Sequence, residues 1–171
     1  MATDGARVEE AEVVKIRIFT DGACSENPGP GGWGAVFNTD DKCLTISGYE
    51  LETTNNRVEL QAVVESIKKI LSLKAPEDND YELYSDSAYV VNAINNNWVN
   101  KWQTNGWKTT KLDDVKNKDL WEQFMFYRTR ARSLGVYIQF FKIKGHSGNT
   151  FNEMVDKLAK SEVLKAKEVL R

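Results

Sequence analysis

The sequence has few of the residues on which several kinds of site and fold depend. Its 171 residues include one histidine and two cysteines, Cys24 and Cys43, which lack CxxC spacing. This argues against a zinc site and against a fold held by disulfides, so reduced thiols are expected. No apolar run approaches the roughly 20 residues of a membrane span, and no basic, apolar leader precedes the first predicted strand. We therefore expect a cytoplasmic protein without a membrane partner.

The chain also lacks the positive charge typical of many nucleic-acid-binding proteins. Its 25 acidic and 23 basic side chains give a net charge of −2. Residues 1–12 hold four of the acids and one basic residue, Arg7, and without this segment 21 acidic and 22 basic side chains remain. We predict a mobile acidic tail at 1–12 and a single domain at 13–171. Metal bound to four of the remaining acids would leave a basic surface, so net charge does not exclude a nucleic-acid partner.

Hydrophobic periodicity divides the rest of the chain into strands and helices. Two-residue alternation and short apolar runs predict strands at 13–21, 31–38, 43–51, 81–86 and 135–143. Apolar residues at helical spacing predict helices over about 54–73, from 87 into a tryptophan-rich stretch, over 120–134 and over 150–170. This order predicts an α/β domain with a mixed sheet, because the first helix supplies the crossover that parallel pairing requires.

Four carboxylates occupy related positions in this scheme. Asp21 is expected to end the first strand, where the glycines after it turn the chain away, and Asp86 ends the fourth strand. Parallel neighbouring strands would bring both to one end of the sheet. Glu59 and Asp156 lie early in two helices, beside apolar positions that face the sheet. Taken singly, each acid has a simpler explanation as a turn residue or as a charge that favours a helix N-terminus.

Carboxylates gathered in one place repel one another and raise one another's pKa. A hard divalent cation relieves this repulsion, and Mg²⁺ prefers oxygen ligands. Two such ions about 3.5–4 Å apart can activate a water and stabilise a leaving alkoxide in phosphoryl transfer.

Several segments resemble ribonuclease H of the type 1 class, in family order from about residue 14 to 165. They are TDGACSENPGPGGWGA, TTNNRVEL, YSDSAYV, WKTTKLDDVKNKDLW, KGHSGN and NEMVDKLA. The resemblance implies a ribonuclease H-like fold, with a five-stranded mixed sheet flanked by helices. It also implies a monomeric endoribonuclease that hydrolyses the RNA strand of RNA–DNA hybrids by two-metal-ion catalysis, leaving 5′-phosphate and 3′-hydroxyl ends. The cofactor would be two Mg²⁺ ions, with Mn²⁺ as a substitute, and the catalytic metal ligands would be Asp21, Glu59, Asp86 and Asp156.

The resemblance also implies a set of substrate contacts. Asn27, Asn55 and Asn56 would contact the minor groove, where an amide can both donate to and accept from a 2′-hydroxyl. Without the family pattern, Asn27 is equally a turn residue and Asn55 a helix cap. A phosphate pocket would include Thr54 and Asn117.

Two tryptophans in a lysine-rich stretch have two interpretations. Trp98 and Trp102 would belong to a protruding handle that grips the DNA strand. They lie one helical turn apart, however, and could instead pack a small satellite core.

His146 lies ten positions before Asp156. By resemblance it moves protons or assists product release, although a loop histidine is often simply solvated. Two residues depart from the pattern of some relatives: Glu52 replaces a basic residue near the phosphate pocket, and Ala88 replaces an amide. Each would weaken substrate binding without touching the chemistry.

Three other functions fit parts of the sequence. One is a nuclease or recombinase of the same fold that acts on DNA, and another is a catalytically weak or silent hybrid-binding module. The third is a domain of a reverse transcriptase. The asparagines and the tryptophan-rich stretch favour a hybrid substrate, and all four carboxylates are retained, which favours an enzyme.

Overall fold

Three long strands open the fold in the computed structural model, which describes residues 13–144 and 149–171. They form an antiparallel meander of β1 (Val14–Cys24), β2 (Gly29–Asn38) and β3 (Cys43–Thr53). The polar residues between β2 and β3 close a tight connection, in which the Thr39 N–H donates to the Lys42 carbonyl at 2.9 Å.

Two shorter strands complete the sheet. Helix α1 (Asn55–Ser72) and a short 3₁₀ turn, η2 (Pro76–Asp78), carry the chain to β4 (Asn79–Ser85). β4 pairs in parallel with β1, and β5 (Ile138–Lys142) pairs in parallel with β4. The order β3-β2-β1-β4-β5 confirms the predicted five-stranded mixed sheet.

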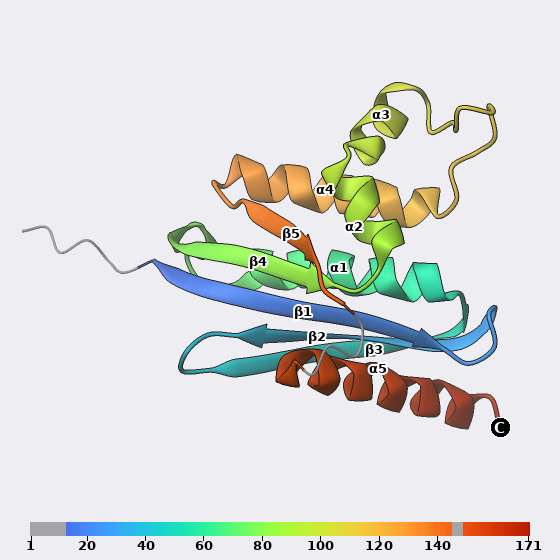
Figure 1. Ribbon diagram of the computed structural model, residues 1–171, viewed down its shortest axis with the longest axis horizontal. Helices are drawn as coiled ribbons and strands as arrows, with labels where there is room; N and C mark the ends of the chain where they lie inside the picture. The colour runs from blue at the N-terminus through green and yellow to red at the C-terminus, as the bar shows by residue number, and fades with distance from the viewer. Residues whose placement is uncertain (1–12, 145–148) are drawn as a thin grey trace, which may run out of the picture.

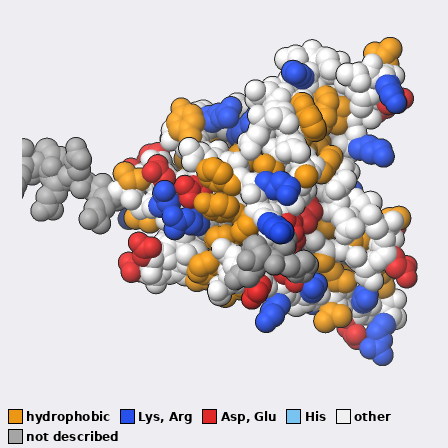
Figure 2. All heavy atoms as spheres, viewed as in Figure 1, with side chains coloured by type: hydrophobic (Ala, Val, Ile, Leu, Met, Phe, Trp, Pro, Cys, Tyr) orange, Lys and Arg blue, Asp and Glu red, His pale blue; other side chains and the backbone are white. Residues whose placement is uncertain are grey.

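Successive residues of β2 face helices on opposite sides of the sheet. Gly32 faces α5 (Thr150–Val169), where an added Cβ would lie 2.4 Å from the Ala159 carbonyl oxygen. The next residue, Trp33, points the other way and packs with Val58 and Ala62 of α1. Helix α5 packs on β1, β2 and β3, as Figure 1 shows, and hydrophobic side chains are visible over β4 and β5 (Figure 2).

The main core lies between the sheet, α1 and α4 (Lys118–Ser133). The apolar stripe predicted for α1 is buried, including Leu60, Val63, Val64, Ile67 and Ile70. Thr54 caps this helix, because its Oγ1 accepts from the Arg57 N–H at 3.3 Å. The packed stripe and the cap fix the first turn of α1 beside the end of β1. Within the described ranges no helix has both the length and the apolar character needed to cross a bilayer.

Two local predictions were wrong. One helix was predicted from residue 87 onward, but the structure has α2 (Ala88–Asn95) and α3 (Trp98–Thr104). Asn97 separates them in the left-handed region with φ 59°, a conformation that asparagine tolerates better than most residues. Asp21 does not end β1, since the strand continues to Cys24 and pairs with the glycine-rich start of β2.

Candidate active site

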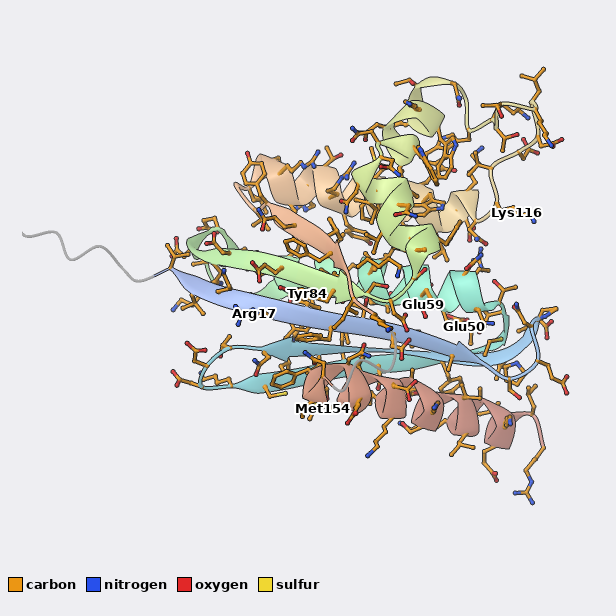
Figure 3. The ribbon with its side chains drawn as sticks, viewed as in Figure 1. Arg17, Glu50, Glu59, Tyr84, Lys116 and Met154 are labelled. Carbon is orange, nitrogen blue, oxygen red and sulfur yellow. The ribbon has the colours of Figure 1, made fainter. Side chains whose placement is uncertain are left out.

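Three carboxylates converge where β1, β4 and α1 meet. Thr20 is paired with Ser85 across the parallel strands, so the next residues, Asp21 and Asp86, come together. Glu59 reaches the same point from α1, beside the end of β4 in Figure 3. One carboxylate oxygen from each of these three acids lies within 4.8 Å of the others. The structure therefore brings together three of the four acids that the sequence singled out.

Gly22 allows α1 to approach the strand this closely. A Cβ at this position would lie 2.7 Å from the Glu59 backbone nitrogen and 2.8 Å from Val58 Cγ2. Real Cβ atoms do not make such contacts, so a side chain here would push Glu59 away from Asp21. The Gly22 N–H also donates to Asp21 Oδ1 at 2.9 Å. The glycine was predicted to turn the chain away, but its function here is to permit close packing.

The electrostatics of the cluster follow from burial and from like charges. Burial, with the charge of Asp86 second, raises the pKa of Asp21 to about 7, although the Gly22 N–H opposes the rise. Burial also raises the pKa of Glu59 well above its ordinary value, and the charges of Asp21 and Asp86 add to the effect. A cation bound among these acids would favour their charged forms and so oppose both shifts.

The donor set fits a hard divalent metal ion. All three side chains offer carboxylate oxygens, which Mg²⁺ and Mn²⁺ both accept. Glu59 Oε2 is fully enclosed and has no hydrogen-bond partner among the described residues. A buried oxygen without a donor is costly unless a cation faces it, so this orphaned atom supports metal binding at the cluster.

Asp156 lies in the same cavity, on the first half of α5. The cavity has a volume of about 280 Å³ and is lined by Asp21, Gly22, Glu59, Asp86, Asn152, Glu153, Asp156 and Lys157. Asp156 is not among the three acids that approach within 4.8 Å, and its Oδ2 lies 2.9 Å from Lys160 Nζ.

The sequence interpretation missed Asn152, Glu153 and Lys157 as lining residues. The first two lie one helical turn before Asp156, and Lys157 follows it directly, so helical spacing from that acid was the available signal.

Two of the predicted minor-groove residues are in direct contact. Asn27 Oδ1 accepts from the Asn55 N–H at 3.1 Å, which joins the β1–β2 turn to the start of α1. Asn55 is the first residue of α1 and Thr54 is its cap, so the interpretation of Asn55 as the cap is wrong. Asn55 and Asn56 are both exposed, as is Asn27. Their side chains are available to a ligand on this edge.

Arg57 links the two residues assigned to the phosphate pocket. Its backbone N–H donates to Thr54 Oγ1, and its Nη1 donates to Asn117 Oδ1 at 3.3 Å. The guanidinium also makes a bidentate pair with Asp119, at 2.9 and 2.8 Å. Glu52 lines the groove beside this pair. The sequence interpretation did not find Arg57 and Asp119, which are 62 positions apart.

The two handle tryptophans have different environments. Trp98 has 41% of its surface exposed. Trp102 is partly buried against the core, with its ring 5.9 Å from that of Trp121 in an edge-on contact. Trp102 is therefore a packing residue, as the alternative interpretation held, but it packs against the main core and not a separate satellite core. Trp98 presents an exposed aromatic face.

Two remaining residues of the sequence interpretation complete the description of the site. Ala88 is the first residue of α2, two positions after Asp86. His146 lies outside the described residues.

Comparison with known proteins agrees with this geometry. The family model for RNase H matches residues 14–164. Ribonuclease H of Caldicellulosiruptor saccharolyticus is 46% identical over 150 residues, 87% of this chain and 96% of the relative. Ribonuclease H of Acetivibrio thermocellus is 47% identical over 152 residues, 88% of this chain and 96% of the relative.

Solved structures with the same fold include two that are named RNase H1. LC9-RNase H1 aligns with a TM-score of 0.73 at 22% identity, covering 92% of this chain and 76% of that one. LC11-RNase H1 in complex with an RNA/DNA hybrid aligns with a TM-score of 0.65 at 25% identity, covering 89% of this chain and 99% of that one. The match of the family model across most of the chain, together with these identities, shows that this protein belongs to the ribonuclease H family.

Proposed function

We propose that this protein is a metal-dependent endoribonuclease that hydrolyses the RNA strand of RNA–DNA hybrids. The observation that carries the proposal is the cluster of Asp21, Glu59 and Asp86, in which an enclosed Glu59 oxygen has no donor within the part of the chain that the structure describes. Family membership supports the same reaction, since the curated relatives are named ribonuclease H. The related LC11-RNase H1 was solved in complex with an RNA/DNA hybrid.

Asp21, Glu59 and Asp86 would hold divalent metal, with Asp156 completing the site from α5. When bound, two Mg²⁺ ions, or Mn²⁺ in their place, supply activation of the attacking water and stabilisation of the leaving oxygen. The chain's own residues fix the geometry: Gly22 admits α1, and its N–H holds Asp21 Oδ1. Lys160 pairs with Asp156 and would have to share that acid with a cation. The products would carry 5′-phosphate and 3′-hydroxyl ends.

The substrate would lie along the edge that carries Asn27, Asn55 and Asn56, with a backbone phosphate near Thr54 and Asn117. The contacts among Asn27, Asn55, Thr54 and Arg57 support this placement, because they hold the polar groups in fixed positions. Trp98 would offer its exposed face to the DNA strand. Amide groups suit a 2′-hydroxyl, the group that distinguishes RNA from DNA.

His146 is proposed, from the sequence alone, to move a proton or to assist product release. Such help typically contributes about 10²- to 10⁴-fold, and we expect a loop residue at the low end. His146→Ala should therefore lower kcat, keep KM within a few-fold and retain metal-dependent cleavage. An unchanged profile of kcat against pH would leave this histidine without a catalytic function.

The defining experiment uses end-labelled RNA–DNA, RNA–RNA and DNA–DNA duplexes of one sequence, with Mg²⁺, Mn²⁺ or chelator. We expect cleavage of the RNA strand of the hybrid only, and none with chelator. Cleavage of the DNA duplex would favour a DNA-acting nuclease of the same fold. Tight hybrid binding without cleavage in either metal would favour a catalytically silent binding module.

The proposal further includes a monomer of one domain, residues 13–171, that acts in the cytoplasm. Light scattering of the purified protein tests the oligomeric state. Cell fractionation tests the location.

A further inference from the structure

A buried arginine outside the carboxylate cluster has no acidic partner in the described parts of the chain. Arg128 of α4 has only 6% of its surface exposed, and its guanidinium lies 4.8 Å from the centre of the Phe124 ring. Its Nη2 donates to Asn100 Oδ1 at 2.9 Å and contacts Met125 Sδ. Among residues 13–144 and 149–171, no carboxylate forms an ion pair with it. Arginines this deeply buried usually have an anionic partner.

A second guanidinium increases the positive charge at this place. Arg132 follows one helical turn later, is exposed and also has no ion pair among the described residues. Burial, with the charge of Arg132 second, lowers the pKa of Arg128 to about 10, so Arg128 remains cationic at neutral pH. Two cations at this spacing repel each other, and an anion bound between them would offset that repulsion.

Both arginines line one cavity of about 350 Å³ between α2, α4 and β5. Asn97 and Phe140 also line it, and the Phe140 ring packs against Phe124 at 5.9 Å. The next residue, Phe141, points to the opposite face of the sheet, where its ring stacks on Tyr84 at 5.3 Å. Of the Arg128 nitrogens, Nε and Nη1 have no acceptor among the residues that the structure describes, yet neither is sealed from solvent. The guanidinium therefore presents unused donors to the cavity, in the planar arrangement that suits a phosphate.

The cavity lies along β5, and the end of β5 pairs with the end of β4 beside the carboxylate cluster. Lys142 of β5 is paired with Ser85, the residue before Asp86. Phe140 lies two residues earlier on β5, about 7 Å along the strand, and lines the cavity. Lys142 and Phe140 thus connect the carboxylate cluster with the cavity along a single strand. Unpaired cations in a cavity along the strand that leads from the carboxylate cluster suit a phosphate of a nucleic-acid strand.

We propose that the Arg128–Arg132 cavity binds a backbone phosphate of a single-stranded extension of the nucleic acid. The inference rests on the proposed function only in taking nucleic acid as the substrate. The extension leaves the hybrid at the carboxylate cluster and follows β5 toward α4. The cavity thereby extends recognition to the strand outside the duplex.

The test measures binding in the presence of chelator, so that no cleavage occurs, using a labelled single-stranded oligonucleotide and a blunt hybrid as probes. Arg132→Ala should weaken oligonucleotide binding about two- to five-fold at low salt. It should also reduce the slope of log K against log salt by about 0.7, the loss of one phosphate contact. Binding of the blunt hybrid should stay unchanged.

Arg130→Ala is the matched control, because Arg130 is also in the last turn of α4 but lines a different groove. It removes the same charge from the same helix end and should leave oligonucleotide binding close to that of the wild type. Equal effects of the two variants would overturn the proposal, since general charge would then explain both.

Arg128→Met tests the buried group directly, with thermal unfolding as the check on folding. Methionine retains apolar contact with Phe124, so the variant should fold and should lose oligonucleotide binding to at least the extent of Arg132→Ala. If Arg128→Met proves unfolded, the Arg132 and Arg130 variants decide alone.

Inorganic phosphate should compete with the oligonucleotide for the wild type, and it should compete less for Arg132→Ala. If the bound phosphate belongs to a nucleic-acid strand, free mononucleotide should compete no better than inorganic phosphate. Competition by an acidic peptide but not by phosphate would show a carboxylate site and overturn the proposal. Weak blunt-hybrid binding by the wild type would instead count against the proposed function.

Discussion

Thr20 of β1 lies directly opposite Ser85 of β4 in a parallel pairing. The residues that follow them, Asp21 and Asp86, therefore start from neighbouring backbone positions about 4.8 Å apart. Glu59 completes the group because Gly22 leaves no Cβ between β1 and α1. Without a cation this arrangement lowers stability, since three carboxylates share a partly buried site. When a cation is bound, the same negative charges attract it. The charges that give the site its metal affinity therefore lower the stability of the metal-free protein.

Asp21→Asn should remove hybrid cleavage and stabilise the metal-free protein. The substitution keeps the side-chain shape while it removes a charge that burial and Asp86 oppose. In chelator at pH 8 we expect a gain of about 1–2 kcal/mol, or about 2–8 °C in Tm. Excess Mg²⁺ should reduce or reverse the difference, because metal binds the folded wild type more tightly.

Asp41→Asn, at an exposed position in the β2–β3 connection, is the control for the loss of one charge and should change neither activity nor Tm. Wild-type turnover in Asp21→Asn, or a loss of stability in chelator, would contradict the assignment of Asp21 as a metal ligand.

The metal-free protein should lose stability as the pH rises from about 5 to 8. The pKa of Asp21 is raised in the folded state to about 7 from an ordinary value of 3.8, so the folded state binds this proton more tightly than the unfolded state. The resulting stabilisation is complete below the unfolded pKa and is lost as the pH rises through the folded pKa. The raised pKa of Glu59 acts in the same direction. Urea midpoints measured in chelator across this range should fall.

Asp21→Asn should show a shallower fall over the same pH range, and saturating Mg²⁺ should flatten the wild-type profile, because metal binding requires deprotonated carboxylates. Parallel profiles for the wild type and the variant would mean that Asp21 does not carry the raised pKa.

The convergence of Asp21 and Asp86 was predictable because strand period and a parallel crossover suffice to place two strand ends together. Glu59 was predictable from its place beside the apolar stripe of α1. The continuation of β1 beyond Asp21 was not, since it depends on pairing with glycines of β2. Secondary-structure propensity depends on the residues nearby in the chain. It therefore cannot show which distant strand a residue will pair with.

Contacts between distant segments explain the other differences. Trp98 and Trp102 have similar sequence contexts, and contact with Trp121 and the main core partly buries only Trp102 of the two. The Arg57–Asp119 pair joins two helices, so charge pattern along the chain gave no signal. The burial of Arg128 likewise depends on α3, which supplies Asn100.

Single substitutions of the two handle tryptophans should have separable effects. Trp98→Ala should weaken hybrid binding with little change in Tm, because its ring is largely exposed. Trp102→Ala should cost about 1–3 kcal/mol of stability, since it removes an edge-on contact with Trp121 and opens the adjoining core. Fluorescence anisotropy with labelled hybrid, paired with urea unfolding, measures both quantities for each variant. If Trp98→Ala binds normally, the exposed ring is not part of the hybrid surface.

Glu52→Gln should raise hybrid affinity about two-fold at low salt, and the gain should disappear above about 0.3 M salt. Glu52 lines the groove beside Arg57 and Asp119, next to the proposed phosphate pocket, so its charge opposes an approaching backbone. Its removal changes no contact with Thr54 or Asn117, and kcat at saturating substrate should therefore stay the same. Glu77→Gln, in η2 at the other end of α1, is the matched control and should leave affinity unchanged. KM measured at several salt concentrations for the three proteins decides the matter. A gain that persists at high salt would point to a local rearrangement of Arg57, and an unchanged KM at low salt would place the backbone away from this groove.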